Sequence, residues 1–352
     1  MNIGILTFHW ATNYGAVLQC YALQNYLISI GHSVKVINYK PHQYDESLYK
    51  FLRYRKFFHL SEYINARKKE KALRKFRSDH LIQTERVYTC DTISKIASQF
   101  DVIISGSDQV TNPSFLMSGE GRDMVSPTYF LGFPYKGKRI GYALSFGCVV
   151  YPEEARKVAS NYIDVFDQIS VREASGVDIV KYMGRRDAKV VPDPTLLMDS
   201  LFYHSLANEC HIDQNIPYVY SFFIRNIADR KLTIDNILKG KDILWNNEDR
   251  DYTMQGWLNK IKQAEFVVTD SFHCVVMCLK LHKSFVVVTD QKGNKGMNDR
   301  LYTLLNKLNL SQQIFFKDDL LDSPFTFHFD WTFIDSKLLE YGNIGKCFLK
   351  AL

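Results

Sequence analysis

Short apolar runs alternate along the chain with segments in which apolar residues recur at helical spacing. Near the start, the helical pattern 16–30 lies between the apolar runs 3–8 and 34–39. Continuous apolar runs of this length predict strands buried on both faces, and the order strand, helix, strand with short connections predicts parallel pairing. The beginning of the chain therefore predicts an α/β domain built on a parallel sheet.

The same alternation continues along the chain with one interruption, the irregular segment 199–216. Further strands are predicted at 100–105, 139–145, 168–172 and 188–192 before it, and at 217–224, 242–245, 266–269 and 285–289 after it. A length of 352 residues also suggests two domains. We expect two doubly wound Rossmann-like domains facing each other across a cleft, over 1–205 and 206–330, with a last helix in 331–352 that returns to the first domain. Ligands of such folds bind at the C-terminal ends of the strands.

The charge of the chain is concentrated in one segment. The whole chain has 44 Lys and Arg against 38 Asp and Glu, a net charge of +6. Eleven basic and three acidic residues lie between Lys50 and His80, so this segment carries +8 and the remainder −2. We predict a basic, aromatic-rich helical insert over 48–80. Its basic side is either a solvated helix face, or a surface over 50–80 that contacts anionic lipid headgroups or a lipid-linked acceptor.

Several broad classes of protein are excluded by composition and motifs. The chain is 46% hydrophobic and 23% charged, which is typical of a globular protein. It has no run near the roughly 18 apolar residues of a membrane-spanning helix and no secretion-signal pattern. Its seven cysteines are scattered without a CxxC pair, which predicts reduced thiols and a cytoplasmic location. The nucleotide signatures GxGxxG and GxxxxGK[ST] are missing as well, and we expect neither a metal nor a bound cofactor.

The most informative strand end follows the predicted strand 266–269. It leads into Asp270, Ser271 and His273, at the start of a helix predicted over 273–281. The N–H groups and dipole of a first helical turn favour an anion, and a histidine there can bind phosphate or donate a proton. Alternatively, Asp270 or Ser271 only caps the helix and His273 packs on its first turn. We expect Asp270 to cap the helix in either case.

Three further charged residues lie at loops where the fold would expose them to a ligand. Arg172 ends a predicted strand, and Arg300 precedes a helix in a Gly- and Asn-rich loop; a guanidinium matches carboxylate or phosphate in bidentate geometry. The alternatives are a domain-interface salt bridge of Arg172 with Glu173 and a solvated helix start for Arg300. Asp108 either caps the helix after its loop or accepts a proton from a sugar hydroxyl.

Taken together, these strand-end loops resemble the polysaccharide pyruvyl transferase family. The matching motifs occur in order between residues 3 and 310: Gly4-Ile5-Leu6-Thr7, Asn13-Tyr14-Gly15-Ala16-Val17-Leu18-Gln19, Gly106-Ser107-Asp108-Gln109 with Asn112-Pro113, Tyr142-Ala143 with Ser145-Phe146-Gly147, Ser170-Val171-Arg172-Glu173 with Ser175-Gly176, Asp193-Pro194-Thr195-Leu196-Leu197, and Thr269-Asp270-Ser271-Phe272-His273. The resemblance implies a glycosyltransferase-B-like fold. It also implies transfer of a pyruvyl group from phosphoenolpyruvate to a sugar as a cyclic ketal, in the synthesis of cell-surface or capsular polysaccharide in bacteria.

The resemblance further implies roles for individual residues. His273 matches the family's histidine, and Asp108 is the second catalytic candidate. Where some members carry Arg two residues before that histidine, this chain carries Ser271, and Arg300 is the candidate for the missing charge. Phosphoenolpyruvate, a co-substrate, would bind on the side of the second domain, through Ser271, His273 and Arg300 of that domain together with Arg172 of the first. The saccharide acceptor, possibly lipid-linked, would bind the first domain through the set Asn13, Tyr14, Gly15, Asp108 and Gln109.

Two other functions fit parts of the sequence. A nucleotide-sugar-dependent glycosyltransferase would have the same fold and would bind a nucleoside diphosphate rather than phosphoenolpyruvate. A nucleic-acid-binding protein could use the interleaved basic and aromatic residues of 50–80. The near-neutral remainder of the chain offers no second basic surface, so we expect no nucleic-acid partner.

Overall fold

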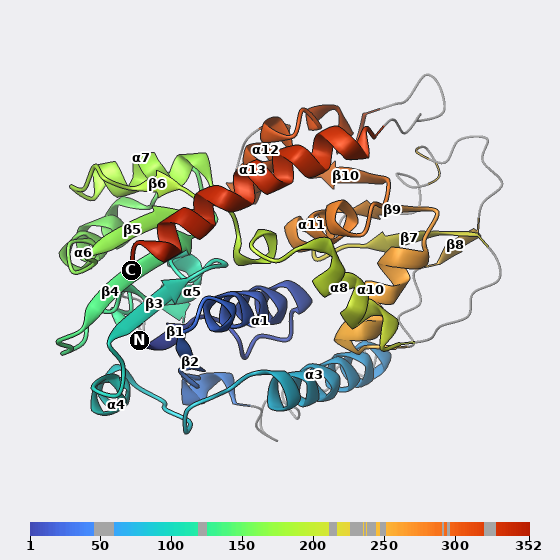
Figure 1. Ribbon diagram of the computed structural model, residues 1–352. Coiled ribbons are helices and arrows are strands. Elements are labelled where there is room, and N and C mark those ends of the chain that lie inside the picture. Colours follow the sequence, from blue (N-terminus) through green and yellow to red (C-terminus); the bar gives the residue numbers. More distant parts are fainter. Residues whose placement is uncertain are drawn as a thin grey trace. The chain divides into compact units, whose positions relative to one another are not determined.

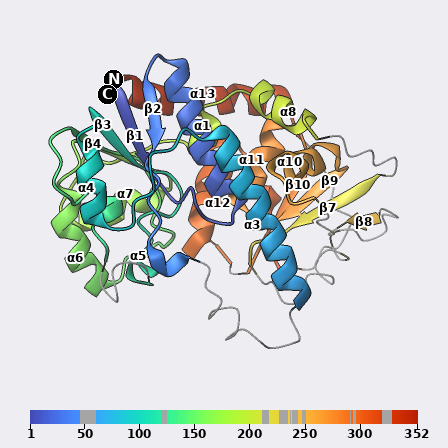
Figure 2. The ribbon, with the colours of Figure 1, turned by 90° about the horizontal axis from the view of Figure 1, so that it is seen from below.

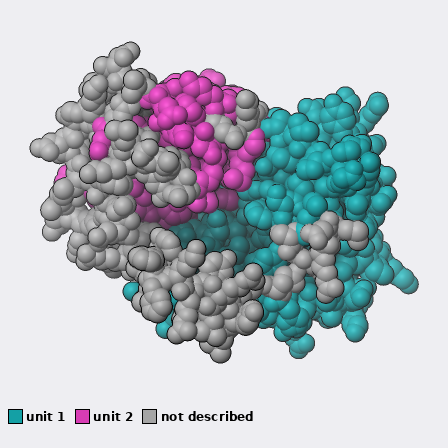
Figure 3. Space-filling model, turned by 180° about the vertical axis from the view of Figure 1, so that it is seen from behind, with its two compact units in different colours: residues 1–197, 344–352 teal, residues 198–343 magenta. Residues whose placement is uncertain are grey.

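The computed structural model describes residues 1–45, 60–118, 125–210, 217–225, 235, 237, 244–246, 251–290, 292–293, 296–319 and 329–352. Figure 3 colours its two compact units: unit 1 comprises Met1–Leu197 and Ile344–Leu352, and unit 2 comprises Met198–Asn343. The division thus comes after Leu197, whereas the sequence pattern placed it after residue 205. The last nine residues of the chain group with unit 1.

Unit 1 is built on a six-stranded parallel sheet (Figure 1). Its strands, in spatial order, are β2 (Ser33–Val36), β1 (Asn2–Leu6), β3 (Val102–Gly106), β4 (Lys138–Leu144), β5 (Gln168–Val171) and β6 (Lys189–Val190). The chain starts at β1, moves out to β2 and then returns to β3 on the other side of β1. This reversal between β1 and β3 is a topological switch point, where doubly wound sheets bind their ligands.

The helices of unit 1 connect these strands. They are α1 (Tyr14–Ser29), α3 (Leu60–His80), α4 (Cys90–Ala97), α5 (Pro113–Ser118), α6 (Glu153–Ile163) and α7 (Ala174–Tyr182), with short 3-10 segments η1 (His42–Tyr44), η3 (Thr128–Phe130) and η4 (Pro194–Leu196). Helix α1 is buried over nearly its whole length, which explains why its sequence is apolar on all sides. Of the predicted insert 48–80, residues 60–80 form α3, and 48–59 lie outside the described residues.

Unit 2 repeats the same plan with a five-stranded parallel sheet (Figure 2). Its strands, in spatial order, are β11 (Ile314–Phe316), β10 (Phe285–Thr289), β9 (Phe266–Thr269), β7 (Tyr218–Phe222) and β8 (Leu244–Asn246). Its helices are α8 (Ser200–Asn208), α10 (Met254–Gln263), α11 (Phe272–Lys280) and α12 (Asp299–Lys307), with 3-10 segments η5 (Gly296–Asn298) and η6 (Ser311–Gln313). The last helix, α13 (Trp331–Lys350), begins in unit 2 and ends in unit 1, as the sequence pattern predicted for 331–352. The switch point of this sheet lies between β7 and β9.

Burial explains the apolar character of these elements. The interior strands β3, β9 and β10 are buried at every position, as parallel strands covered on both faces must be. Helix α11 is also buried throughout, so Cys274 and Cys278 serve there as small apolar residues. The two parallel sheets confirm the expected fold class, α/β with two Rossmann-like domains. No described helix is long and apolar enough to cross a membrane.

Candidate functional site

The loops at the two switch points carry most of the polar residues singled out by sequence. In unit 1, Asn13 lies in the loop after β1, and Asp108 and Gln109 lie in the loop after β3. In unit 2, Arg225 lies after β7, and residues 270–273 lie after β9. Because the carboxyl ends of parallel strands meet at one edge, each pair of loops lies side by side within its unit.

The loop after β1 ends in the cap of α1. The Asn13 side-chain oxygen accepts a hydrogen bond from the backbone N–H of Ala16 at 3.2 Å, which makes Asn13 the N-cap. Tyr14 and Gly15 are buried in the first turn, and the Nζ of Lys69 on α3 lies 4.3 Å from the centroid of the Tyr14 ring. Of the three acceptor-binding candidates in this loop, only Asn13 is partly exposed.

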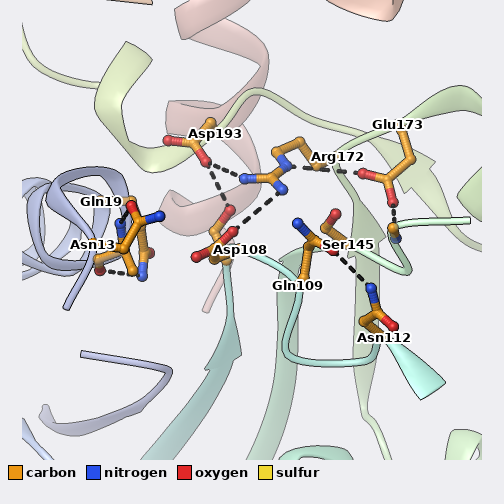
Figure 4. A network of polar contacts seen from close by, with 12 residues as sticks. Asn13, Gln19, Asp108, Gln109, Asn112, Ser145, Arg172, Glu173 and Asp193 are labelled. Carbon is orange, nitrogen blue, oxygen red and sulfur yellow. Dashed lines mark hydrogen bonds and ion pairs between the residues drawn. The ribbon is translucent and has the colours of Figure 1, made fainter. Parts of the chain in front are cut away.

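Arg172 lies at the end of β5 among three carboxylates (Figure 4). Its Nη1 donates to Asp193 Oδ2 at 2.9 Å, its Nη2 lies 3.6 Å from Asp108 Oδ1, and its Nε lies 3.8 Å from Glu173 Oε2. Burial acts to lower the pKa of this guanidinium, but the three carboxylates raise it above its usual range. The side chain of Arg172 is 1% exposed and that of Asp108 is 15% exposed. This group of four residues therefore carries more negative than positive charge.

The loops after β3, β4 and β5 are tied to one another by the same network. Glu173 Oε1 accepts the backbone N–H of Phe146 at 2.6 Å and that of Gly147 at 3.3 Å. Asn112 Nδ2 donates to Gln109 Oε1 at 2.7 Å, and Gly147 approaches this pair so closely that a Cβ would lie 2.3 Å from Gln109 Oε1. These bonds position the loop that carries Asp108 and Gln109.

The alternative role of Asp108 as a helix cap is wrong. Helix α5 begins five residues later, at Pro113, and Asn112 Oδ1 accepts the backbone N–H of Ser114 at 2.9 Å. Asp108 instead has a left-handed backbone, with φ of 60°, and its carboxylate faces Arg172. The ion pair of Arg172 with Glu173 is present, but both residues lie within unit 1, so it does not join two domains.

In unit 2, Ser271 rather than Asp270 caps α11. Ser271 Oγ accepts the backbone N–H of Cys274 at 3.3 Å. The Asp270 carboxylate bridges the switch point instead, accepting the backbone N–H groups of Ile224 at 2.7 Å and Arg225 at 2.9 Å. The expectation that Asp270 caps the helix is therefore wrong, because its carboxylate is taken by the neighbouring loop. His273 lies in the first turn, 5% exposed, with its ring at 87° to that of Phe272.

Two arginines border this turn of α11. Arg225 Nε lies 3.5 Å from Asp270 Oδ2, its Nη1 donates to Asp290 Oδ1 at 2.7 Å, and its Nη2 donates to Asn298 Oδ1 at 3.3 Å. Arg300 lies in the first turn of α12 with its Cζ 5.9 Å from the centroid of the Phe272 ring. Arg300 is 8% exposed, so the alternative of a solvated helix start is wrong.

Sequence reasoning missed Arg225, although the signal was present. Arg225 directly follows the predicted strand 217–224, in the same way that Arg172 ends the strand 168–172. The structure groups the expected residues in two sets: Asp108, Gln109 and Arg172 in unit 1, and Ser271, His273 and Arg300 in unit 2. Among the described residues, no three His, Cys, Asp or Glu side chains are grouped as a metal site.

Comparison with known proteins identifies the family. The UDP-GlcNAc 2-epimerase from Neisseria meningitidis bound to UDP-GlcNAc is 10% identical, covers 98% of this chain and 93% of that chain, and has a TM-score of 0.46. The epimerase from Methanocaldococcus jannaschii is 11% identical, covers 97% and 93%, and has a TM-score of 0.45. No curated protein matches the sequence. The sequence model of the family described as polysaccharide pyruvyl transferase matches residues 13–291 and confirms the family expected from the motifs. The chain belongs to the polysaccharide pyruvyl transferase family.

Proposed function

We propose that the protein transfers the pyruvyl group of phosphoenolpyruvate to two hydroxyls of a saccharide, forming a cyclic ketal and releasing phosphate, in the synthesis of a bacterial cell-surface polysaccharide. The observation that carries this proposal is the first turn of α11, at the switch point of unit 2. His273 lies there, with Arg225 and Arg300 bordering it. A helix N-terminus flanked by two guanidinium groups favours a ligand with phosphate and carboxylate groups.

Some family members carry an arginine where this chain has Ser271, and we assign the missing positive charge to Arg225. It reaches the turn through Asp270, and its side chain is 20% exposed. Its ion pair with Asp290, whose side chain is 39% exposed, is the contact that a donor phosphate would replace, because phosphate offers a guanidinium two oxygens at once. Arg300 would hold the second anionic group of the donor. No metal or bound cofactor takes part in this scheme.

The chemistry assigned to His273 is proton donation to the donor. Protonation of the methylene carbon of phosphoenolpyruvate leaves an oxocarbenium centre at the neighbouring carbon. One sugar hydroxyl adds there and loses its proton. Phosphate then leaves with the electron pair of its carbon–oxygen bond, and the second hydroxyl adds and loses its proton to close the ketal. For the hydroxyl protons, the base we assign is Asp108, a partly exposed carboxylate of unit 1.

The acceptor is assigned to unit 1 because of the charge at its strand ends. Asp108, Glu173 and Asp193 outnumber Arg172, so an anionic donor would be repelled there, whereas carboxylate and amide oxygens accept hydrogen bonds from sugar hydroxyls. Arg172 is therefore assigned to holding Asp108 and Asp193 in place, not to the donor. Asn13 and Gln109 complete the acceptor-binding set.

For the place of the reaction, we assign a lipid-linked acceptor at the cytoplasmic face of the membrane. Helix α3 has exposed basic side chains at Arg67, Lys68, Lys71 and Arg74. Its side chains from Tyr63 to Lys68 are all exposed, whereas Leu73 and Phe76 pack into unit 1. Lysines and arginines at the surface of a membrane interact favourably with anionic headgroups.

Calorimetric titration with phosphoenolpyruvate, UDP and GDP tests the donor assignment. The wild type is expected to bind phosphoenolpyruvate, and Arg225→Met to bind it about tenfold or more weakly, because a charge-assisted hydrogen bond is lost. Arg156→Met, which removes a partly exposed arginine paired with Glu153 on α6, is the matched control and is expected to bind normally. Binding of a nucleoside diphosphate without binding of phosphoenolpyruvate would contradict the assignment and favour a glycosyltransferase.

A further inference from the structure

Aromatic side chains gather at the same edge of unit 1 as the acceptor-binding residues. Phe8 and Trp10 lie in the loop after β1, Tyr44 lies in η1 after β2, and Phe115 lies in α5 after β3. These three strands are neighbours in a parallel sheet, so the segments that follow them leave it at one edge. We call Phe8, Trp10, Tyr44 and Phe115 the aromatic surface.

The rings of the aromatic surface contact one another in series. The Phe8 centroid lies 5.7 Å from that of Trp10 and 5.8 Å from that of Phe115, with interplanar angles of 67° and 83°. The Trp10 and Tyr44 centroids are 4.6 Å apart at 34°. Phe8 also packs on the buried ring of Tyr129 at 4.7 Å, which anchors the series to the core. Edge-to-face contacts of this kind fix ring orientation.

Charged residues next to Tyr44 and Trp10 form contacts that fix this end of the series. Asp45, next to Tyr44, pairs with Arg86 and lies 3.8 Å from Lys40. Lys40 Nζ in turn lies 5.8 Å from the centroid of the Trp10 ring. Partial burial acts to raise the pKa of Asp45, but the hydrogen bond and charge of Arg86, with help from His42 and Lys40, lower it. Asp45 is thus charged at neutral pH, and the rings are set in place before any ligand arrives.

Exposure shows that the aromatic surface is not simply core. Phe115 is 45% exposed, and Phe8, Trp10 and Tyr44 are partly exposed. Large exposed apolar side chains that are contiguous mark binding surfaces. The polar residues of the acceptor set adjoin the same segments: Asn13 follows Trp10 by three residues, and Gln109 accepts a hydrogen bond from Asn112, which leads directly into α5. An apolar surface with a few adjacent hydrogen-bonding groups is the composition of a small-molecule site.

We propose that the aromatic surface is a saccharide-binding subsite that stacks a sugar ring of the acceptor. The C–H groups on one face of a pyranose ring form an apolar patch that fits an aromatic side chain, and the hydroxyls at the ring edge remain available to Asn13, Asp108 and Gln109. A sugar ring is uncharged and matches this combination better than phosphoenolpyruvate, whose two anionic groups would meet Asp45 and Asp108. The proposal rests on the proposed function in that it assigns the acceptor to unit 1.

The test is a fluorescence titration of the full chain with methyl glycosides of galactose, glucose, mannose and N-acetylglucosamine and with their oligosaccharides. Trp10 is the reporter, so we expect saturable quenching in the wild type. Trp10→Phe is expected to lose most of the signal but to keep affinity by calorimetry, because phenylalanine also stacks. Trp10→Ala and Phe115→Ala are each expected to weaken affinity about three- to tenfold, as loss of one aromatic contact does. Circular dichroism melting checks that each variant is folded.

Tyr182→Ala is the matched control, because Tyr182 is an aromatic residue of unit 1 that is 73% exposed at the end of α7. It is expected to bind glycosides as the wild type does. The proposal is overturned if no glycoside or oligosaccharide binds saturably, if Phe115→Ala binds normally, or if Tyr182→Ala weakens binding as much. Glycoside binding without phosphoenolpyruvate binding would contradict the donor assignment but support the saccharide subsite. Phosphoenolpyruvate binding without any glycoside binding would support the donor assignment and contradict the subsite.

Discussion

The guanidinium of Arg172 lies among the carboxylates of Asp108, Glu173 and Asp193. These contacts distinguish between two possible roles of Arg172, whereas the family motif is compatible with both. A residue that binds the donor and a residue that positions a carboxylate both need a positive charge at the end of β5. Only the second role fits a side chain that is 1% exposed and surrounded by carboxylates. Removing a charge from such a buried group is strongly destabilising, so a charge-conserving substitution is the informative one.

For Arg172→Lys we expect phosphoenolpyruvate affinity within about twofold of the wild type and a free energy of unfolding lowered by about 1–3 kcal/mol, because lysine cannot hold Asp108 and Asp193 at once. Calorimetry and urea denaturation measure the two quantities. A tenfold loss of phosphoenolpyruvate affinity in a folded Arg172→Lys protein would return Arg172 to the donor site.

His9 provides a second prediction at the scale of a residue. Burial lowers its pKa from 6.5 to about 4, with smaller contributions from Arg77 and Lys40. The ring lies 3.2 Å from the Thr7 carbonyl oxygen through Nδ1 and 3.2 Å from the Asn38 side chain through Nε2. The Asn38 atom is its Oδ1, so both partners are acceptors, and the neutral ring with its single N–H can donate to only one of them.

Because the pKa is lower in the folded state, the unfolded chain takes up a proton first as the pH falls. The stability contribution of neutral His9 is complete above pH 6.5 and is lost between pH 6.5 and 4, by about 2 kcal/mol at pH 5. Urea denaturation at pH 7 and pH 5 measures this loss, and His9→Gln is expected to show a smaller pH dependence than the wild type. Equal pH dependence in the two proteins would mean that His9 is not the buried neutral group described here.

At the scale of elements, most of the parallel strands and of the helices between them follow from the sequence, because each is a continuous apolar run or a helical repeat. Helix α8 and strand β11 do not: α8 lies in the segment 199–216 that the sequence pattern left irregular, and β11 is three residues long. The same pattern placed Asp108, Arg172 and His273 at strand ends. It could not predict their partners, because those come from distant loops: Asp270 bonds to residues 45 and 46 positions earlier in the chain. Because the Asp270 carboxylate bonds to these residues, Ser271 is the cap of α11, and Arg225 lies beside the candidate site.

Gly106 shows how closely two of these elements approach. It ends β3 with a φ of 129°, and a Cβ at this position would lie 2.0 Å from the carbonyl oxygen of Tyr142 on β4. Gly106→Ala is therefore expected to lower the free energy of unfolding by about 3 kcal/mol or more, because backbone atoms cannot move aside as a side-chain end can. Gly184→Ala, at a positive φ but with open space around it, is the control and is expected to cost about 1 kcal/mol. Equal stability of the two variants would contradict the close approach of β3 and β4.

At the scale of the whole molecule, the concentration of basic residues in α3 has no part in the proposed reaction. Within α3, Glu70 pairs with the buried Arg77 at 2.6 Å and accepts a hydrogen bond from Thr12, which ties the helix to the loop after β1. The same helix exposes the basic side chains of Arg67, Lys68, Lys71 and Arg74. They are the residues assigned above to the membrane surface.

Changing Arg67, Lys68, Lys71 and Arg74 together to Gln is expected to abolish co-sedimentation with phosphatidylglycerol vesicles, since each basic residue near an anionic surface contributes about 1 kcal/mol. Phosphatidylcholine vesicles should bind neither protein, and added salt should weaken binding of the wild type. Lys157→Gln, at an exposed position of α6, is the matched control. If sedimentation of the wild type did not depend on anionic lipid, the membrane assignment would be wrong.

We propose that the protein transfers a pyruvyl group with His273 as the proton donor. This proposal is tested most directly by incubating the protein with phosphoenolpyruvate and a panel of free and lipid-linked saccharides, and recording product masses together with released phosphate. The account predicts an acceptor whose mass rises by one pyruvyl ketal group, with one phosphate released per ketal, and a rate lowered about a hundredfold or more in folded His273→Gln. Near-normal turnover of His273→Gln, or transfer of a sugar from a nucleotide donor in place of the pyruvyl group, would contradict it.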